Sequence, residues 1–273
     1  METYYQPTTS FIGQFSGAAA AYSVRCLTAG SSTARCMKVR RDSDNATQDI
    51  GFDSNGDLDT AAISSHCGAN NGYVVTWYDQ SGSGQNVTNS TTTQQPKIYN
   101  GTAVITENGK PALDFQDDVI YTSGNITLSD GAFLSVAVGT TNNGQNNVLL
   151  ASDGSPRVGQ FVRTSNNTIQ SIGFTSGGSA VVASGPSVAV DTQFIGIGQC
   201  TGTLLTAYAN GTGGTALSLT NRTDSAPLYL GARSAALQDA HNGYIQEVIH
   251  YPDDQSSNRS GIDSNINTYF SVY

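Results

Sequence analysis

The segment Val74–Val87, VVTWYDQSGSGQNV, joins the only tryptophan of the chain to a tyrosine, an aspartate and alternating glycines. An aromatic ring beside a carboxylate is typical of a sugar-binding surface, because the ring has an apolar face and the carboxylate accepts hydrogen bonds. Trp77, Tyr78 and Asp79 are therefore candidate carbohydrate-binding residues. In the structural interpretation, the two rings anchor an edge of the fold and Asp79 caps a turn with Ser81.

Three histidines offer the other common catalytic side chain. His66, His241 and His250 fall in a predicted helix, a loop and a strand, and the chain has no G-x-S-x-G turn to present a nucleophile. We expect no catalytic triad and interpret His66 and His250 as structural. Asp239 and His241, in the loop sequence QDAHNGY, complete the candidate carbohydrate-binding set.

Metal and phosphate sites have weak signals. Oxygen-bearing side chains alternate as in a calcium loop at Asp53, Asn55, Asp57 and Asp59. Position twelve of that loop is Ser64 where Glu is needed, so a solvated turn is favoured and a bound ion is the alternative. The sequence GTGGTA at 211–216 lies between two short strands and is interpreted as a hairpin turn. We expect no metal and no cofactor.

Charge is unevenly distributed along the chain. The net charge is −9, yet residues 1–41 hold five bases against one acid, Glu2. This asymmetry suggests docking on an acidic partner, and a solvated strand face is the alternative. The candidate docking residues are Arg35, Lys38, Arg40 and Arg41. The remainder of the chain is so acidic that nucleic-acid binding is not expected.

The pattern of short β-rich runs separated by Gly, Asn and Ser predicts an all-β, antiparallel jelly-roll β-sandwich with one or two short helices. We expect residues 1–12 to form an extended anchoring arm and residues 13–273 to form one domain. The expected strands are 72–78, 103–106, 132–140, 148–151, 160–163, 169–174, 180–183, 193–199, 204–209, 228–230 and 244–251.

Two helices are predicted. The first begins after an Asp59 N-cap and stops at Gly68. The second has a favourable first turn at Pro252 with the two aspartates that follow it. Its apolar stripe consists of Ile262, Ile266 and Phe270.

The N-terminus has no basic segment followed by an apolar run, and no window is long and apolar enough for a transmembrane helix, so we expect neither export nor membrane insertion. The four cysteines show no C-x-x-C spacing and are expected to be buried thiols; a Cys26–Cys36 bridge across a hairpin is the alternative. The cysteines are Cys26, Cys36, Cys67 and Cys200.

Several motifs in the C-terminal half, from Gly131 to Tyr273, resemble the laminin-G-like, concanavalin-like jelly roll. They are YANG at 208–211, LGAR at 230–233 and GYIQEVIHY at 243–251. The resemblance implies two curved antiparallel sheets that often serve as a carbohydrate-binding or protein-binding scaffold.

A second resemblance covers Ala21–Val87, through AYSVRCL, KVRRDSDN, LDTAAI and WYDQSGSGQNVT. This half is similar to the catalytic domain of fungal B-type α-L-arabinofuranosidases, and the combination also resembles domains of bacteriophage structural proteins. For the enzymes, the resemblance implies an acid/base Asp near Ala235 and a nucleophilic Glu within Val148–Pro156. Neither residue is present, although Asp153 and Asp239 form a possible displaced pair.

The glutamates of the chain are Glu2, Glu107 and Glu247. They lie in the arm, before a turn and inside a strand, so none replaces the missing nucleophile. We therefore expect a non-enzymatic virion structural protein, located on the virion surface as a capsid decoration or a tail or fibre component. Its expected partners are other virion proteins and host surface glycans, and we expect many copies or a homo-oligomer. The alternatives are a glycoside hydrolase related to arabinofuranosidases and a soluble carbohydrate-binding module.

Overall fold

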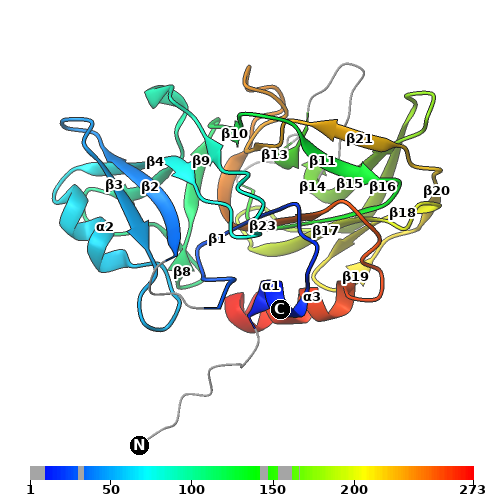
Figure 1. The fold of residues 1–273 in the computed structure, drawn as a ribbon, viewed down its shortest axis with the longest axis horizontal. Helices are drawn as coiled ribbons and strands as arrows, with labels where there is room; N and C mark the ends of the chain where they lie inside the picture. Colours follow the sequence, from blue (N-terminus) through cyan, green and yellow to red (C-terminus); the bar gives the residue numbers. More distant parts are fainter. Residues whose placement is uncertain (1–9, 30–33, 142–146, 153–161, 166) are drawn as a thin grey trace, which may run out of the picture.

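The computed structural model describes residues 10–29, 34–141, 147–152, 162–165 and 167–273. Antiparallel strands build both halves of the molecule, and the predicted all-β sandwich is confirmed (Figure 1). The strands of the first half are β1 (Ala20–Ser23), β2 (Arg35–Arg41), β3 (Thr47–Gly51), β4 (Asn71–Trp77), β5 (Val87–Thr88), β6 (Lys97–Asn100), β7 (Thr106–Glu107), β8 (Lys110–Pro111), β9 (Leu113–Gln116) and β10 (Ile120–Thr122).

The second half contains the longer strands. They are β11 (Ile126–Asp130), β12 (Phe133–Gly139), β13 (Asn147–Ala151), β14 (Val162–Ser165), β15 (Thr168–Phe174), β16 (Ala180–Ser187), β17 (Phe194–Cys200), β18 (Leu204–Ala209), β19 (Thr212–Gly213), β20 (Leu217–Ser218), β21 (Thr223–Ala226), β22 (Tyr229–Leu230) and β23 (Asn242–Tyr251). The helices are α1 (Phe11–Gln14), α2 (Thr60–Cys67), α3 (Arg259–Phe270) and the 3-10 turn η2 (Thr92–Gln94).

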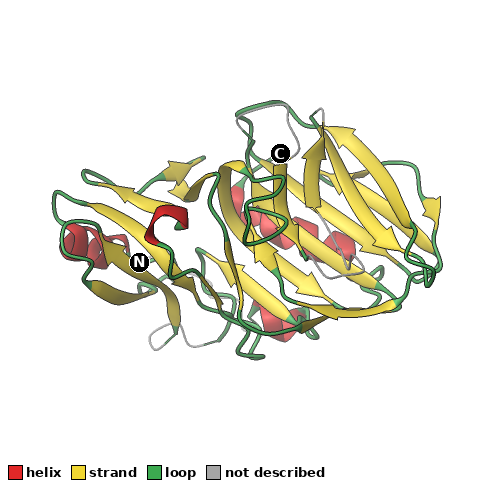
Figure 2. Ribbon diagram, turned by 90° about the horizontal axis from the view of Figure 1, so that it is seen from above, coloured by secondary structure: helices red, strands yellow, loops and turns green. Residues whose placement is uncertain are grey.

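Strand β23 is shared by the two halves. One of its edges pairs with β9 and then with β1, and the other edge pairs with β12. From β23 the first half continues through β9, β6, β4, β2 and β3, and the second half continues through β12, β17 and β18. Every residue of β12 and of β17 is buried, which explains why these strands read as nearly unbroken apolar runs. Figure 2 shows strands running through both halves with α3 behind them.

Most of the predicted strands are present with shifted ends. The strand expected from residue 244 begins at Asn242 and is internal, as predicted. Residues 160–161 of the expected strand 160–163 lie outside the described residues. The strand expected at 103–106 is not formed, since Val104 makes only an isolated bridge with Tyr99 and β7 begins at Thr106. The sequence did not predict the short strands β1, β6, β9 and β10, because three or four residues are too few to show a periodic pattern.

Helix α2 is capped as the sequence predicts. The Asp59 side chain accepts a hydrogen bond from the backbone N–H of Ala62, and Gly68 ends the helix with a φ of 59°. Ile63 and Cys67 are the buried residues of the helix, so α2 packs one face on the first half.

The second helix begins later than predicted. Helix α3 starts at Arg259. The residues between Tyr251, where β23 ends as predicted, and α3 form local turns, in which Asp254 accepts a hydrogen bond from the backbone N–H of Ser256. The predicted apolar stripe is confirmed, because Ile262, Ile266 and Phe270 are all buried.

Residues 10–12 of the predicted N-terminal arm belong to the body of the fold. Residues 1–9 lie outside the described residues, but Phe11 and Phe15 are buried and α1 packs beside α3 (Figure 1). The assignment of residues 10–12 to an extended arm is therefore wrong, because the two phenylalanines bind this segment to the body of the fold.

The cysteines are all free thiols, and Cys36, Cys67 and Cys200 are buried while Cys26 is half-buried. The alternative of a Cys26–Cys36 bridge is therefore not supported. Burial raises the pKa of the Cys36 thiol well above its usual range, so this thiol is un-ionised and unreactive in the folded protein. Within the described parts of the chain, the helices are all too short and polar to cross a membrane.

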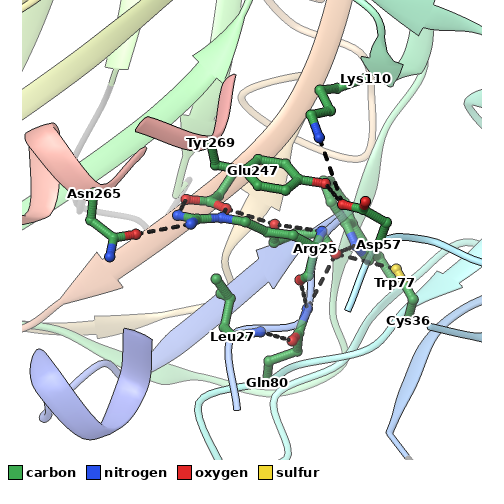
Figure 3. Close-up of polar contacts among 11 residues, drawn as sticks. Arg25, Leu27, Cys36, Asp57, Trp77, Gln80, Lys110, Glu247, Asn265 and Tyr269 are labelled. Carbon is green, nitrogen blue, oxygen red and sulfur yellow. Dashed lines mark hydrogen bonds and ion pairs between the residues drawn. The ribbon is translucent and has the colours of Figure 1, made fainter. Parts of the chain in front are cut away.

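A buried ion pair connects the first strand, the shared strand and the last helix (Figure 3). Arg25 Nε and Nη2 donate to the two carboxylate oxygens of Glu247 at 2.7 and 3.0 Å, and Arg25 Nη1 donates to Asn265 of α3 at 2.8 Å. Ser23 of β1 donates a further hydrogen bond to Glu247. Both oxygens of the fully buried Glu247 carboxylate are thus bound in bidentate geometry.

Removing the cation of this pair should be strongly destabilising. We expect Arg25→Met to lower the free energy of unfolding by about 3–5 kcal/mol, because the Glu247 carboxylate would stay buried without a counter-charge. The measurement is chemical denaturation at neutral pH. Lys38→Met is the control, since its ion pair with Asp49 is more than one-third exposed on both sides and should contribute about 0–1 kcal/mol. Equal effects of the two substitutions would contradict the role of the Arg25 pair.

Candidate active site

Four polar side chains form a row across the sheet of the first half. Backbone pairing places Arg40 of β2 opposite Tyr73 of β4, Tyr73 opposite Lys97 of β6, and Lys97 opposite Asp114 of β9. Directly opposed residues of antiparallel strands project from the same face, so the four side chains are neighbours although the sequence separates them widely. The row alternates cation, aromatic ring, cation and acid.

This row lies along a polar cavity of about 500 Å³. The η2 segment forms one wall, and Gln116 and Asp118 at the end of β9 form another. A second hollow of about 350 Å³ is also lined by Lys97 and Asp114, together with Tyr244 of β23. Lys97 and Asp114 therefore lie where the two hollows adjoin.

Asp114 and Asp118 are the acid groups at the β9 side of the cavity. Burial is the main cause that raises the pKa of Asp118 to about 7, and the charges of Asp114 and Asp117 add to it. Burial also raises the pKa of Asp114, against the opposing effects of the Gln116 amide, 2.8 Å away, and of Lys97. Near neutral pH the cavity thus contains a carboxyl group, Asp118, that can donate a proton, and a second acid, Asp114, on the same cavity. Two such groups on one cavity are what general acid–base catalysis requires.

The LGAR motif supports the strand that carries these acids. Gly231 has a φ of 86°, and a Cβ at this position would lie 2.2 Å from the Phe115 ring and 2.7 Å from the backbone oxygen of Asp118. The backbone N–H of His241 donates a hydrogen bond to the backbone oxygen of Gly231, and the backbone oxygen of His241 accepts a hydrogen bond from the backbone N–H of Asp117. The motif is therefore a close packing contact beneath β9, and its glycine sets the position of the Asp118 loop.

Burial limits the roles of two candidate carbohydrate-binding residues. Trp77 is fully buried, with its indole N–H directed to the backbone oxygen of Ser23, so its ring is not available for stacking on a sugar. His241 is also fully buried, and burial lowers its pKa to about 4, so it is a neutral core residue packed edge-on against Phe115. These two assignments are corrected for that reason.

Tyr78 and Asp79 lie together in a separate shallow hollow with Arg35. Asp79 accepts hydrogen bonds from the backbone N–H groups of Ala21, Ser81 and Gln85, which is the turn-capping role that the structural interpretation predicted. A sugar-binding role for these two residues stays a prediction.

Asp239 is half-buried and forms an ion pair with Arg233 at 2.9 Å. Asp153, its proposed partner in a displaced catalytic pair, lies outside the described residues. Ala235, the position that the resemblance assigns to the acid/base, is exposed and carries no acid.

The candidate docking cations have partners within the chain. Arg35 and Lys38 lie near Asp49, and Arg41 binds Asp44 at 2.6 Å. Arg40 is buried and lines the polar cavity. They therefore do not act as one exposed basic surface here, and docking on a partner stays a prediction.

The possible calcium loop is occupied by internal contacts. Asp53 accepts backbone hydrogen bonds from Asn55 and Asp57, Asp57 binds the Tyr269 hydroxyl, and Asp59 caps α2. Among the described residues, no group of three or more metal-binding side chains was found.

Sequence reasoning missed Asp114 and Asp118. The stretch LDFQDD contains the only signal, namely an acid inside a short apolar run and two more at its end. Nothing local indicates that Asp114 lies beside Lys97, because that contact is made by strand pairing.

The fold and the cavity together define a β-sandwich protein with an acid-bearing polar cavity. The family model of the catalytic domain of alpha-L-arabinofuranosidase B matches residues 13–156, more than half of the chain. The chain belongs to this family.

Solved structures show the same fold. A GH54 α-L-arabinofuranosidase soaked with a cyclic sulfate inhibitor matches with a TM-score of 0.59 at 15% identity, over 91% of this chain and 62% of that chain. A mutant of a GH54 α-L-arabinofuranosidase soaked with 4-nitrophenyl α-L-arabinofuranoside gives 0.61 at 15% identity, with the same coverage. An arabinofuranosidase complexed with arabinofuranosyl-α-1,2-xylobiose gives 0.57 at 16%, again over 91% and 62%. This chain thus spans less than two-thirds of those solved chains. No curated protein matches the chain significantly.

These findings correct the functional expectation. The prediction of a non-enzymatic virion structural protein is wrong, because the matching family is that of a catalytic domain and the fold is that of solved glycosidases. The comparisons give no support for a bacteriophage protein. The expected partners, copy number and location stay predictions.

The raised pKa of Asp118 predicts a pH-dependent stability. A carboxyl group that ionises near pH 7 when folded and near pH 4 when unfolded makes the folded state lose stability as the pH rises between these values. Asp118→Asn removes this loss. The difference between the melting temperature of the variant and that of wild type should therefore be more positive at about pH 8 than at about pH 5. Asp44→Asn is the control and should show no such trend, because Arg41 lowers the pKa of Asp44 to about 2. A flat profile for Asp118→Asn would contradict the assignment.

The packing of Gly231 predicts a steric effect on the same loop. Gly231→Ala should lower the free energy of unfolding by about 1–3 kcal/mol more than Gly109→Ala, as measured by denaturation. Gly109 also has a positive φ, of 74°, but a Cβ there would meet nothing within 4 Å. Equal losses would mean that backbone strain alone, and not the contact with Phe115 and Asp118, requires glycine at position 231.

Proposed function

We propose that this protein is a glycoside hydrolase that cleaves α-L-arabinofuranosidic bonds, with the polar cavity as its active site. The observation that carries the proposal is the pair Asp114 and Asp118, two carboxyl groups with raised pKa on one cavity. Family membership and the fold of the solved arabinofuranosidases support the choice of sugar.

Hydrolysis of a glycosidic bond needs two carboxyl groups in different protonation states. Asp118, with a pKa of about 7, donates its proton to the glycosidic oxygen as the bond to the anomeric carbon breaks. Asp114 supplies the carboxylate that either accepts a proton from the attacking water or attacks the anomeric carbon itself. Lys97, opposite Asp114, favours the ionised form of that group.

The proposal predicts which acids are needed for turnover. Wild-type protein should release 4-nitrophenol from 4-nitrophenyl α-L-arabinofuranoside and arabinose from arabinofuranosyl-xylobiose. Asp114→Asn should lower kcat on both substrates by roughly 10²–10⁴-fold. Asp118→Asn should lower kcat more on the saccharide than on the nitrophenyl substrate, because 4-nitrophenol is a good leaving group that needs less protonation.

Three further variants make this test specific. Asp44 is an exposed acid in the turn after β2, so Asp44→Asn should retain the wild-type kcat. Asp153→Asn and Asp239→Asn test the displaced pair that the resemblance suggests. Turnover that is lost in these two variants and kept in the Asp114 and Asp118 variants would place catalysis elsewhere, and absence of turnover in wild type would refute the glycosidase proposal.

A further inference from the structure

Arg40 is a buried cation whose bonds all go to neutral groups. Its Nε donates to Gln95 Oε1 at 2.8 Å, Nη1 to Asn45 Oδ1 at 3.0 Å and Nη2 to the Thr92 backbone oxygen at 3.2 Å. The residue is only 7% exposed, and among the described residues no carboxylate lies within ion-pair distance of its guanidinium. A buried charge without a counter-ion is costly, so this arrangement calls for an explanation.

The bonds of Arg40 leave part of its donor capacity unused. A guanidinium has five N–H groups, and the contacts above use three of them. Gln95 and the η2 segment hold the group rigidly at the cavity wall, so little conformational entropy would be lost on binding an anion.

Lys97 and Tyr73 extend the same end of the cavity. The Arg40 guanidinium carbon lies 4.9 Å from the centre of the Tyr73 ring, and the Lys97 ammonium lies 5.8 Å from it. Tyr73 is half-buried and lines the cavity between the two cations. A ring flanked by two positive charges suits a sugar that stacks on the ring and carries a negative group beside it.

The acids of the cavity do not neutralise Arg40. Asp42 accepts a hydrogen bond from Asn71, and Asp114 is held by Gln116. The backbone of Arg40 is three strand spacings from that of Asp114, a separation on the order of 14 Å. In the described part of the chain, Arg40 is therefore a cation without an ion-pair partner at the β2 end of the cavity, where Asp42 also lies, while Asp114 and Asp118 lie at the β9 end with Lys97 opposite Asp114.

We infer that the Arg40 end of the polar cavity binds the carboxylate of an acidic saccharide, so that the ligand is a glycan chain bearing uronic acid residues. Arg40 and Lys97 bind the carboxylate, and Tyr73 supports the sugar ring. Since the separation between Arg40 and Asp114 exceeds the length of one sugar ring, a uronate whose carboxylate binds Arg40 and the bond to be cleaved at Asp114 belong to different residues of the chain. The placement of the cleaved bond at Asp114 rests on the proposed function, whereas the binding of the uronate at Arg40 does not.

The test is calorimetric titration of the Asp118→Asn variant, which avoids turnover during the measurement. The probes are an oligogalacturonate, its fully methyl-esterified form and an oligosaccharide of the same length that carries sulfate esters and no carboxylate. We expect the uronate to bind roughly 10–100-fold more tightly than the methyl ester, which is the range for charge-assisted hydrogen bonds. Equal affinity for acid and ester would overturn the inference, and tighter binding of the sulfated probe would overturn the carboxylate assignment.

Variants added to this background identify the groups. Lys97→Met should remove most of the preference for the acid over the ester. Tyr73→Ala should lower the affinity for the uronate and for its methyl ester by the same factor. Arg40→Gln should also remove the preference for the acid. Because Arg40 is buried, circular dichroism checks whether the Arg40→Gln variant folds. If that variant does not fold, Lys97→Met is the decisive variant, since Lys97 is half-exposed. Lys38→Met, at a cation that does not line the cavity, is the control and should change neither affinity. An unchanged preference in Lys97→Met would refute the inference.

Failure of this inference is distinguishable from failure of the proposed function. Arabinose release by wild type without any preference for the uronate would refute only the acidic ligand. A preference for the uronate without arabinose release would refute only the glycosidase.

Discussion

The bidentate pair between Arg25 and Glu247 is the interaction on which the arrangement of the two halves depends. Glu247 lies in β23, which borders both halves, and Arg25 follows β1 and reaches α3 through Asn265. The guanidinium also lies over the rings of Phe11, Tyr269 and Phe270, so charge and apolar packing meet at one point. Because the desolvated pair needs every one of these hydrogen bonds, it specifies a single register for β1 against β23. That register in turn fixes the β9 edge on which the candidate catalytic acids lie.

Local sequence signals predicted those parts of the fold that are determined locally. The Asp59 cap, the Gly68 stop and the stripe of α3 depend on residues within a few positions of one another, and the structure has them all. The later start of α3 shows the limit of such signals, because Asp253 and Asp254 accept hydrogen bonds from Gln255 and Ser256 in turns that precede the helix. The class of fold followed from the spacing of apolar runs, whereas the pairing of strands far apart in sequence did not.

The candidate site was hidden for the same reason. Arg40, Tyr73, Lys97 and Asp114 are each unremarkable in their own segments, and they become neighbours only through three strand pairings. The sequence did point to Trp77, whose rarity and surroundings suggested a binding role, but its whole ring is in the core. Rarity of a residue type therefore indicated packing in this chain, and the candidate site consists of common residues in one row.

The position of β23 near the end of the chain has a consequence for how the molecule reaches its fold. This strand pairs with β1, so β1 has no partner at this edge until a strand more than 200 residues later in the sequence has been synthesised. Contacts of such high sequence separation slow folding, since the closing of a long loop precedes the contacts that stabilise it. A fragment that stops at residue 156, where the family match ends, lacks the partner of β1, β9 and β12. The sandwich is thus completed only after β23 has been synthesised, and until then the edges of β1 and β12 are exposed to pairing with other chains.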